Sequence, residues 1–215
     1  MTRRLLSFRC WLGLCIVLGL AACARTPAPP PTPVTLRVRA TDLTAPLVFD
    51  LTAVYAEVNP SIFLEVSLVP LSTLNSDLAA GRADLGFVST YSPNQFATPV
   101  GYTPFAVIVH PSNVLTHLSS ARLPDIFAGR ASRWAQAGEL APQGATIQVV
   151  SREPNSDAAE AFALRVQALG GQGSAANSAL LAPTWAAMRE AVSQDPNAIG
   201  YLPKIELDQT VKALE

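Results

Sequence analysis

Apolar and polar residues alternate along Val34–Arg39, which is the pattern of a half-buried strand. A helix is predicted next, from Thr44 or Ala45 to Val58, and Pro46 suits its first turn. Asn59-Pro60 ends this helix. The apolar residues that recur at helical spacing are Leu47, Leu51, Val54, Tyr55 and Val58.

Two further strands and a short helix are predicted in the first half of the chain. The strands are Ile62–Val69 and Ala83–Val88. Between them, Ser72 or Thr73 can cap a helix that continues through Ala80 and stops at Gly81. The resulting β-α-β-α-β order favours a parallel sheet with helices on its faces.

The second half repeats the alternation of strands and helices without a sequence repeat. Strands are predicted at Phe105–Val109, Ile147–Val150 and Ala198–Leu202. Helices are predicted at Pro124–Phe127 (ended by Gly129), from a cap at Ser156 through Leu169, and at Thr184–Val192. The glycines form neither a phosphate-binding P-loop nor a dinucleotide fingerprint.

The N-terminal segment has the pattern of an export signal. Arg3, Arg4 and Arg9 precede the uncharged run Cys10–Ala22, which is too short to span a membrane. The run ends in Leu20-Ala21-Ala22-Cys23, which resembles a bacterial lipobox, where cleavage precedes the cysteine and a diacylglycerol is added to its sulfur. An ordinary signal peptide or a signal anchor that happens to carry Cys23 is the alternative.

The lipobox interpretation divides the N-terminus into two parts. Residues 1–22 are the signal peptide, and residues 23–33 form a tether with five prolines, which favour an extended polyproline II conformation. Such a tether spans roughly 30 Å at about 3.1 Å per residue. We therefore expect the protein to be exported and lipid-anchored to the outer face of the bacterial cytoplasmic membrane. A disordered N-terminus without this purpose gives the same structural prediction.

Composition and charge exclude several classes of protein. The 215 residues carry a formal net charge of −1, which excludes a generally basic nucleic-acid binder, and 49 % are hydrophobic, which argues against disorder. Removal of residues 1–22 leaves 12 basic and 16 acidic residues, a formal charge of −4, and one of the three cysteines. With lipid on Cys23, no thiol remains for a disulfide or a metal site, and we expect no cofactor.

Four stretches, in order, resemble the phosphate-binding proteins of ABC importers, the PstS-like family of type II periplasmic binding proteins. Leu78–Gly86 is similar to the family's L-x-x-G-x-A-D-(I/F)-G segment, and Ala198–Tyr201 matches its (A/G)IGY strand. Val107–Asn113, followed by Leu118 through Trp134, resembles its IVHPxNP stretch, and Val150–Ser156 resembles its anion loop. The likeness covers roughly residues 35–205.

The resemblance implies an α/β fold of two lobes, with parallel-rich sheets flanked by helices, that close on a ligand. Lobe 1 is expected at 34–103, lobe 2 at 104–202, and a return segment or C-terminal tail at 203–215. Little chain remains after Leu202, which allows a reduced first lobe. The resemblance also implies a monomer without enzymatic activity that binds a small phosphate-like anion and delivers it to an ABC permease.

By position, the resemblance implies ligand contacts in the turns between strands and helices. Such sites hold an oxyanion with backbone N–H groups, hydroxyl groups and an arginine, often together with a carboxylate that accepts the ligand's proton. The residues at the corresponding positions are Thr41, Leu43, Ser72, Asp84, Arg152 and Ser156.

Two of these turns depart from the family pattern. The family's serine-glycine-threonine is Ser156-Asp157-Ala158 here, and Val69–Thr73 contains no glycine. Two unit charges about 4 Å apart interact by roughly 4 kcal/mol at an effective dielectric constant near 20. If Asp157 faces the site, it therefore weakens the binding of a dianion on the order of a thousandfold.

Several candidate residues also have structural interpretations. Arg152 can contact the ligand or pair with Asp157 or Glu153, Asp84 can be a turn residue, and Ser156 can be a helix cap. Trp134 and Trp185 fit a core, and no spacing around His110 or His117 suggests a metal site.

Two functions remain open from the sequence. The leading hypothesis is a lipid-anchored solute-binding protein of an ABC importer. The alternative is a degenerate relative that acts as a sensor or protein-partner module without binding phosphate. A hydrolase is less favoured, because no Ser-His-Asp order or nucleophile elbow is present.

Overall fold

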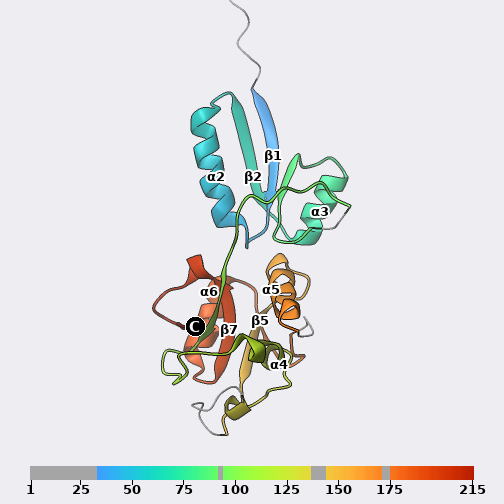
Figure 1. The fold of residues 1–215 in the computed structure, drawn as a ribbon. Coiled ribbons are helices and arrows are strands. Elements are labelled where there is room, and N and C mark those ends of the chain that lie inside the picture. The colour runs from blue at the N-terminus through green and yellow to red at the C-terminus, as the bar shows by residue number, and fades with distance from the viewer. Residues whose placement is uncertain (1–32, 92–93, 137–143, 171–174) are drawn as a thin grey trace, which may run out of the picture. The chain divides into compact units, whose positions relative to one another are not determined.

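The computed structural model describes residues 33–91, 94–136, 144–170 and 175–215 (Figure 1). The chain divides into two units, residues 1–33 and residues 34–215, and only the second is described below. The predicted signal peptide, Cys23 and nearly all of the tether lie outside the described residues. Within the described ranges, no helix has the length and apolar character needed to cross a membrane.

The first sheet contains three parallel strands in the order β2-β1-β3. These strands are β1 (Val34–Ala40), β2 (Ile62–Leu68) and β3 (Leu85–Phe87), and the connections carry α2 (Ala45–Val58) and α3 (Leu71–Ala79). The predicted β-α-β-α-β order is confirmed. A small core of Val38, Ala40 and Val48 lies between the sheet and α2.

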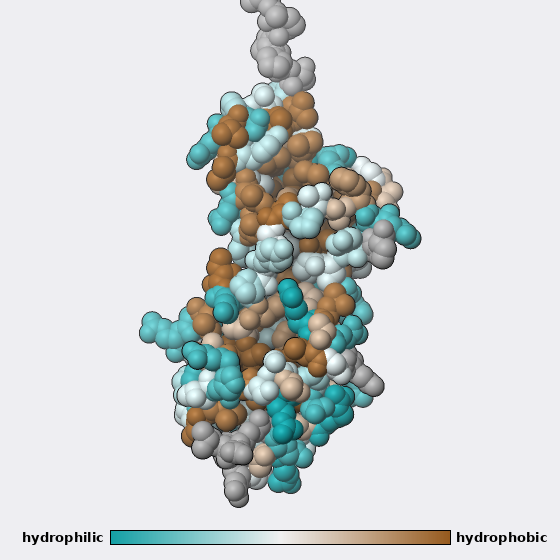
Figure 2. All heavy atoms as spheres, viewed as in Figure 1, coloured by the Kyte–Doolittle hydropathy of each residue, from teal (hydrophilic) through white to brown (hydrophobic). Residues whose placement is uncertain are grey.

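Most of the apolar repeat of α2 is not buried. Val54 is 62 % exposed and Val58 is 69 % exposed, whereas the residues that α2 buries are Ala45 and Val48. Figure 2 shows the apolar surface that results over α2. The repeat predicted the helix correctly, but a three-stranded sheet offers too little surface to cover its whole apolar face.

The predicted cap of α3 is wrong. The helix begins at Leu71 after Pro70, and no side chain caps it, so Ser72 and Thr73 lie inside its first turn and are exposed. The predicted stop is close to the observed one, because Gly81 follows the helix with a left-handed φ of +66°.

The second sheet contains five strands in the order β6-β5-β7-β4-β8. Strand β5 is parallel to β6 and β7, whereas β4 is antiparallel to β7 and β8. The strands are β4 (Phe105–Val109), β5 (Gln148–Arg152), β6 (Leu180–Ala182), β7 (Ala198–Pro203) and β8 (Lys212–Leu214).

Helices flank this sheet, and two of them begin at side-chain caps. Ser156 Oγ accepts a hydrogen bond from the Ala159 N–H at 3.2 Å, and Thr184 Oγ1 accepts one from Ala187 at 3.1 Å. The capping role predicted for Ser156 is confirmed. The helices are α4 (Leu123–Phe127), α5 (Asp157–Ala168) and α6 (Trp185–Gln194), with 3₁₀ turns at Ser120–Arg122, Trp134–Gln136 and Lys204–Glu206.

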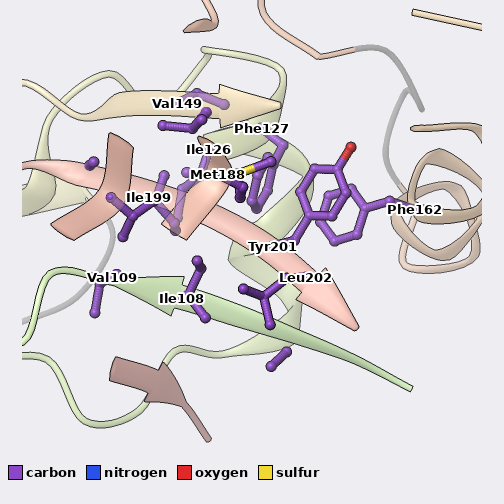
Figure 3. Close-up of a cluster of buried hydrophobic side chains, with 14 of the residues drawn as sticks. Ile108, Val109, Ile126, Phe127, Val149, Phe162, Met188, Ile199, Tyr201 and Leu202 are labelled. Carbon is purple, nitrogen blue, oxygen red and sulfur yellow. The ribbon is translucent and has the colours of Figure 1, made fainter. Parts of the chain in front are cut away.

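The main core packs around β7, and all six of this strand's residues are buried. Phe162 of α5 and Tyr201 of β7 stack with ring centroids 3.7 Å apart (Figure 3). Trp134 and Trp185 belong to this core, as predicted. Gly200 allows β7 to approach α6, because a Cβ there would lie 2.7 Å from Met188 Sδ.

The end of the chain joins the second sheet. After β7 and a 3₁₀ turn, β8 pairs with β4, within the part of the chain expected to be a return segment or C-terminal tail. Strands β6 and β8 have only three residues each, which is too short for an alternating pattern to predict them.

Candidate functional site

The turn that follows β1 holds Thr41 in a fixed position at the carboxyl edge of the first sheet. The Thr41 N–H donates to Thr44 Oγ1 at 3.1 Å, and the Ala45 N–H donates to the Thr41 carbonyl at 3.0 Å. Thr44 Oγ1 also donates to the Phe87 carbonyl at the end of β3. Thr41 is also buried (2 % exposed), so its hydroxyl can serve as a fixed donor. Ligands of open α/β sheets bind at this edge.

Donors from two turns of the first sheet converge on the carboxylate of Asp157. Thr41 Oγ1 donates to Asp157 Oδ2 at 2.5 Å, and Ser89, just beyond β3, donates its hydroxyl to Oδ1 at 2.5 Å. The Ser89 N–H lies 3.1 and 3.2 Å from the two carboxylate oxygens. Asp157 is only 2 % exposed, so these contacts replace most of its hydration.

Two physical effects favour a buried charge at Asp157. It is the first residue of α5, where the helix dipole presents its positive end. Hydrogen bonds to an ionised carboxylate are about twice as strong as neutral ones. The arrangement of hydroxyl and N–H donors is therefore that of an anion site, and a carboxylate of the protein occupies it.

Arg152 is held by contacts within the protein. Its side chain is 6 % exposed, and its Nη2 pairs with Asp42 in the turn after β1. Its Nη1 donates to the Ala182 carbonyl at 3.2 Å, and its Cζ lies 4.5 Å from the centroid of the Trp185 ring. Its Nε has no partner among the described residues. Arg152 therefore has a charged partner in Asp42, where the sequence suggested Asp157 or Glu153.

The hydroxyl of Tyr201 supports the backbone beneath Arg152. The Arg152 N–H donates to the Tyr201 oxygen at 3.2 Å, and Ser151 Oγ lies 3.4 Å from the same oxygen. Burial raises the pKa of Tyr201 above its ordinary value, despite the opposing effect of both contacts. Tyr201 is therefore a neutral phenol at physiological pH.

Asp84 lies at the other end of β3. Its carboxylate receives Arg37 Nη2 at 2.9 Å, Arg37 Nε at 3.1 Å and the Arg37 N–H at 2.8 Å. These bonds lower the pKa of Asp84 to about 2. Asp84 precedes β3 whereas Ser89 follows it, so the strand separates this ion pair from the Asp157 cluster.

The other candidates take different positions. Leu43 is buried in the main apolar core, so it could meet a ligand only through its backbone. Ser72 is exposed in the first turn of α3, and the Oγ of Ser156 is engaged in capping α5. The structure thus links Thr41 to the first turn of α5 and Arg152 to the turn after β1, while Ser72 and Asp84 make other contacts or face solvent.

Sequence reasoning missed two residues of this cluster, Ser89 and Asp42. Both follow a strand of the first sheet closely, and that position was the available signal.

Two cavities lie near α5. The smaller, of about 170 Å³, is lined by Leu71, Asn75, Thr90, Tyr91, Gln95 and Glu160. The larger, of about 420 Å³, includes Ser151, Arg152, Asn155, Phe162, Asn177 and Tyr201 in its lining. The smaller one has room for only a small solute and a few waters. The described residues contain no group of three or more potential metal ligands.

Most of the chain matches a known protein family. Residues 26–209 match the family described as the PBP superfamily domain. The chain belongs to this family. The expected α/β fold and the expected membership of the PBP superfamily are thereby confirmed. No curated protein sequence matches the chain significantly.

Solved structures of two kinds share the fold. An ABC-type phosphate transport receptor from Vibrio cholerae is 22 % identical, with a TM-score of 0.65. A putative phosphate ABC transporter substrate-binding protein with bound phosphate, from Clostridium perfringens, is 20 % identical, with a TM-score of 0.70. Each match covers 84 % of this chain and 75 % of the other.

The second kind is regulatory. A mutant of the OxyR2 regulatory domain from Vibrio vulnificus is 15 % identical, with a TM-score of 0.58, and the match covers 88 % of this chain and 84 % of the other. At these identities the likeness establishes the fold alone. The same fold therefore occurs in transport receptors and in regulatory domains, and the site has to decide the function.

Proposed function

We propose that this protein is the extracytoplasmic solute-binding component of an ABC importer and binds a small, phosphate-like oxyanion. The observation that carries the proposal is the convergence of Thr41 Oγ1, Ser89 Oγ and the Ser89 N–H on one pair of carboxylate oxygens. Donors in this arrangement suit the oxygens of a free oxyanion as well as those of Asp157.

The remaining predicted contacts are assigned by position. Ser72 at the start of α3 provides a hydroxyl group, and Leu43 provides its backbone. Ser156 at the start of α5 provides its hydroxyl only by exchanging its hydrogen bond to the Glu153 carbonyl. Arg152 joins the ligand only by exchanging its contact with Asp42. The ion pair with Arg37 makes Asp84 the candidate that needs the largest rearrangement.

Calorimetry on the mature chain (residues 23–215) tests the ligand. Phosphate, sulfate, molybdate and small carboxylates are titrated up to millimolar concentrations, and we expect saturable binding of at least one of them. Ser89→Ala should weaken that binding at least tenfold, whereas Ser193→Ala should not, because Ser193 is a half-buried serine on α6 whose hydroxyl donates to the Glu190 carbonyl of the same helix. If none of these anions binds the wild type or the Asp157 variants described below, the oxyanion is the wrong ligand.

The anchor is proposed to be a lipid on Cys23. Labelled fatty acid should be incorporated into the wild type and not into Cys23→Ser, and the variant should leave the membrane fraction. Membrane retention of an unlabelled Cys23→Ser protein would instead indicate a signal anchor.

A second candidate function is favoured by the same cluster. Asp157 is 2 % exposed and already engages Thr41 and Ser89, as expected of a sensor or partner-binding module that binds no oxyanion. Affinity capture from host membranes distinguishes the two functions. Recovery of permease subunits alone supports the importer, and recovery of another protein without permease supports the second candidate.

A further inference from the structure

We propose that Asp157 is a tethered anion that occupies the ligand position of its own site and holds the turns of the two sheets together without a ligand. A free oxyanion must therefore displace this carboxylate before it can bind. The displacement rests on the function proposed above, whereas the link between the sheets does not depend on any ligand.

The contacts of Asp157 are those expected of a bound anion. Both oxygens are used: Oδ1 receives the Ser89 hydroxyl and N–H, and Oδ2 receives the Thr41 hydroxyl and the same N–H. A carboxylate in a first helical turn ordinarily interacts with N–H groups of its own helix. The partners of Asp157 instead lie 68 and 116 residues away in the sequence.

A second contact joins the same two segments, and in this one the carboxylate belongs to the turn after β1. Thr41 donates to the carboxylate at the start of α5, while the adjacent Asp42 accepts from Arg152 at the end of β5. Two neighbouring residues of the turn after β1 thus contact a negative group at the start of α5 and a positive group at the end of β5. This pairing of complementary charges favours one register of the two turns.

Charge makes occupation by Asp157 and by a free dianion mutually exclusive. A singly charged anion about 4 Å from Asp157 would bind roughly a thousandfold more weakly than it would beside a neutral residue, and a dianion would bind more weakly still. A tethered group also competes at an effective concentration in the millimolar range or above. The apparent affinity for a free anion is reduced by the fraction of molecules in which Asp157 occupies the site.

The experiment compares Asp157→Asn and Asp157→Gly with the wild type. Asp50→Asn is the matched control, because Asp50 is a solvent-exposed carboxylate on α2. The protein is the mature chain with Cys23→Ser, which leaves residues 23–215 without cysteine. Spin labels at Glu57→Cys on α2 and Gln167→Cys on α5, both exposed, report the distance between the two sheets' helices. Circular dichroism verifies that each variant is folded.

The first measurement uses no ligand. We expect one narrow distance distribution for the wild type and for Asp50→Asn, and a longer or broader one for both Asp157 variants. An unchanged distribution in both folded Asp157 variants would overturn the proposal.

The second measurement is the affinity for inorganic phosphate by calorimetry. We expect at least tenfold tighter binding in Asp157→Gly than in the wild type. Tight wild-type binding that Asp157→Gly does not improve overturns the displacement and leaves the proposed function intact. If the distance distribution changes but no variant binds phosphate, the link through Asp157 stands and phosphate is excluded as the ligand.

Discussion

Thr41 donates its hydroxyl to Oδ2 of Asp157 across 2.5 Å, and this bond joins residues that are 116 positions apart. It connects the turn after the first strand to the first turn of α5. The bond therefore contributes to the stability of the whole domain as well as to the chemistry of the site.

Replacing Thr41 with valine should lower the free energy of unfolding by about 1–3 kcal/mol, because a buried carboxylate loses a donor while the side-chain volume is kept. Denaturant unfolding monitored by circular dichroism measures the change. Thr35→Val, at an exposed position of β1, the strand that precedes Thr41, is the control and should change stability by less than about 0.5 kcal/mol. Equal stability of the two variants would show that the bond contributes nothing.

The ion pair of Asp42 and Arg152 should show energetic coupling in a double-mutant cycle. Arg152→Gln alone should be strongly destabilising, by about 3 kcal/mol, because Arg152 is buried and also contacts Ala182 and Trp185. Asp42→Asn should cost less, since 42 % of its side chain is exposed. We expect a coupling energy of about 1 kcal/mol between the two changes, and strict additivity would contradict the pairing.

Asp84 should make stability depend on acid pH. Its pKa is about 2 in the folded protein and near the ordinary value of 3.8 when unfolded, so its stabilising effect is complete above pH 4 and is lost as the pH falls towards 2. Unfolding measured at pH values from 5 to 2 should show a shallower decline for Asp84→Asn. Arg37→Gln removes the ion-pair partner of Asp84, so its stability should also decline less steeply between pH 5 and pH 2. A decline as steep as that of the wild type in both variants would show that other groups cause the acid sensitivity.

Gly200→Ala tests the packing of β7 on α6. The added Cβ would lie 2.7 Å from Met188 Sδ and 3.1 Å from Val192 Cγ2, so we expect a loss of about 1–3 kcal/mol of stability. Thermal or denaturant unfolding measures it. The cost should shrink when Met188→Ala is already present, because the clash is then relieved. An equal cost in both backgrounds would point to backbone effects of glycine instead.

The sequence predicted the elements well where a pattern extended over five residues or more. The bounds of Phe105–Val109 were predicted without error, and helix α5 was placed within one residue because Ser156 supplies a cap. The cap of α3 was wrong because Pro70 itself precedes the helix, and nothing in the local pattern distinguished it from Ser72. The strands β6 and β8 depend on pairing with distant segments, which no local pattern records.

The site was predicted in part. Its location in the turns after the strands followed from the resemblance, and Asp157 was recognised as the departure from the family pattern. The partners of Asp157 could not be predicted, since Thr41 and Ser89 meet it only through the tertiary fold. The pairing of Arg152 with Asp42, and not with the nearby Glu153, also depends on the tertiary fold.

The contact between the Arg152 guanidinium and the Trp185 ring gives the protein an intrinsic optical probe. Trp134 and Trp185 are the tryptophans downstream of residue 22, and Trp134 is fully buried in the core. A Trp134→Phe protein therefore emits from Trp185 alone, 4.5 Å from a cation whose other partner is Asp42. The emission of that one indole should follow the exchange of Arg152 between Asp42 and an incoming solute, in real time and without an attached dye.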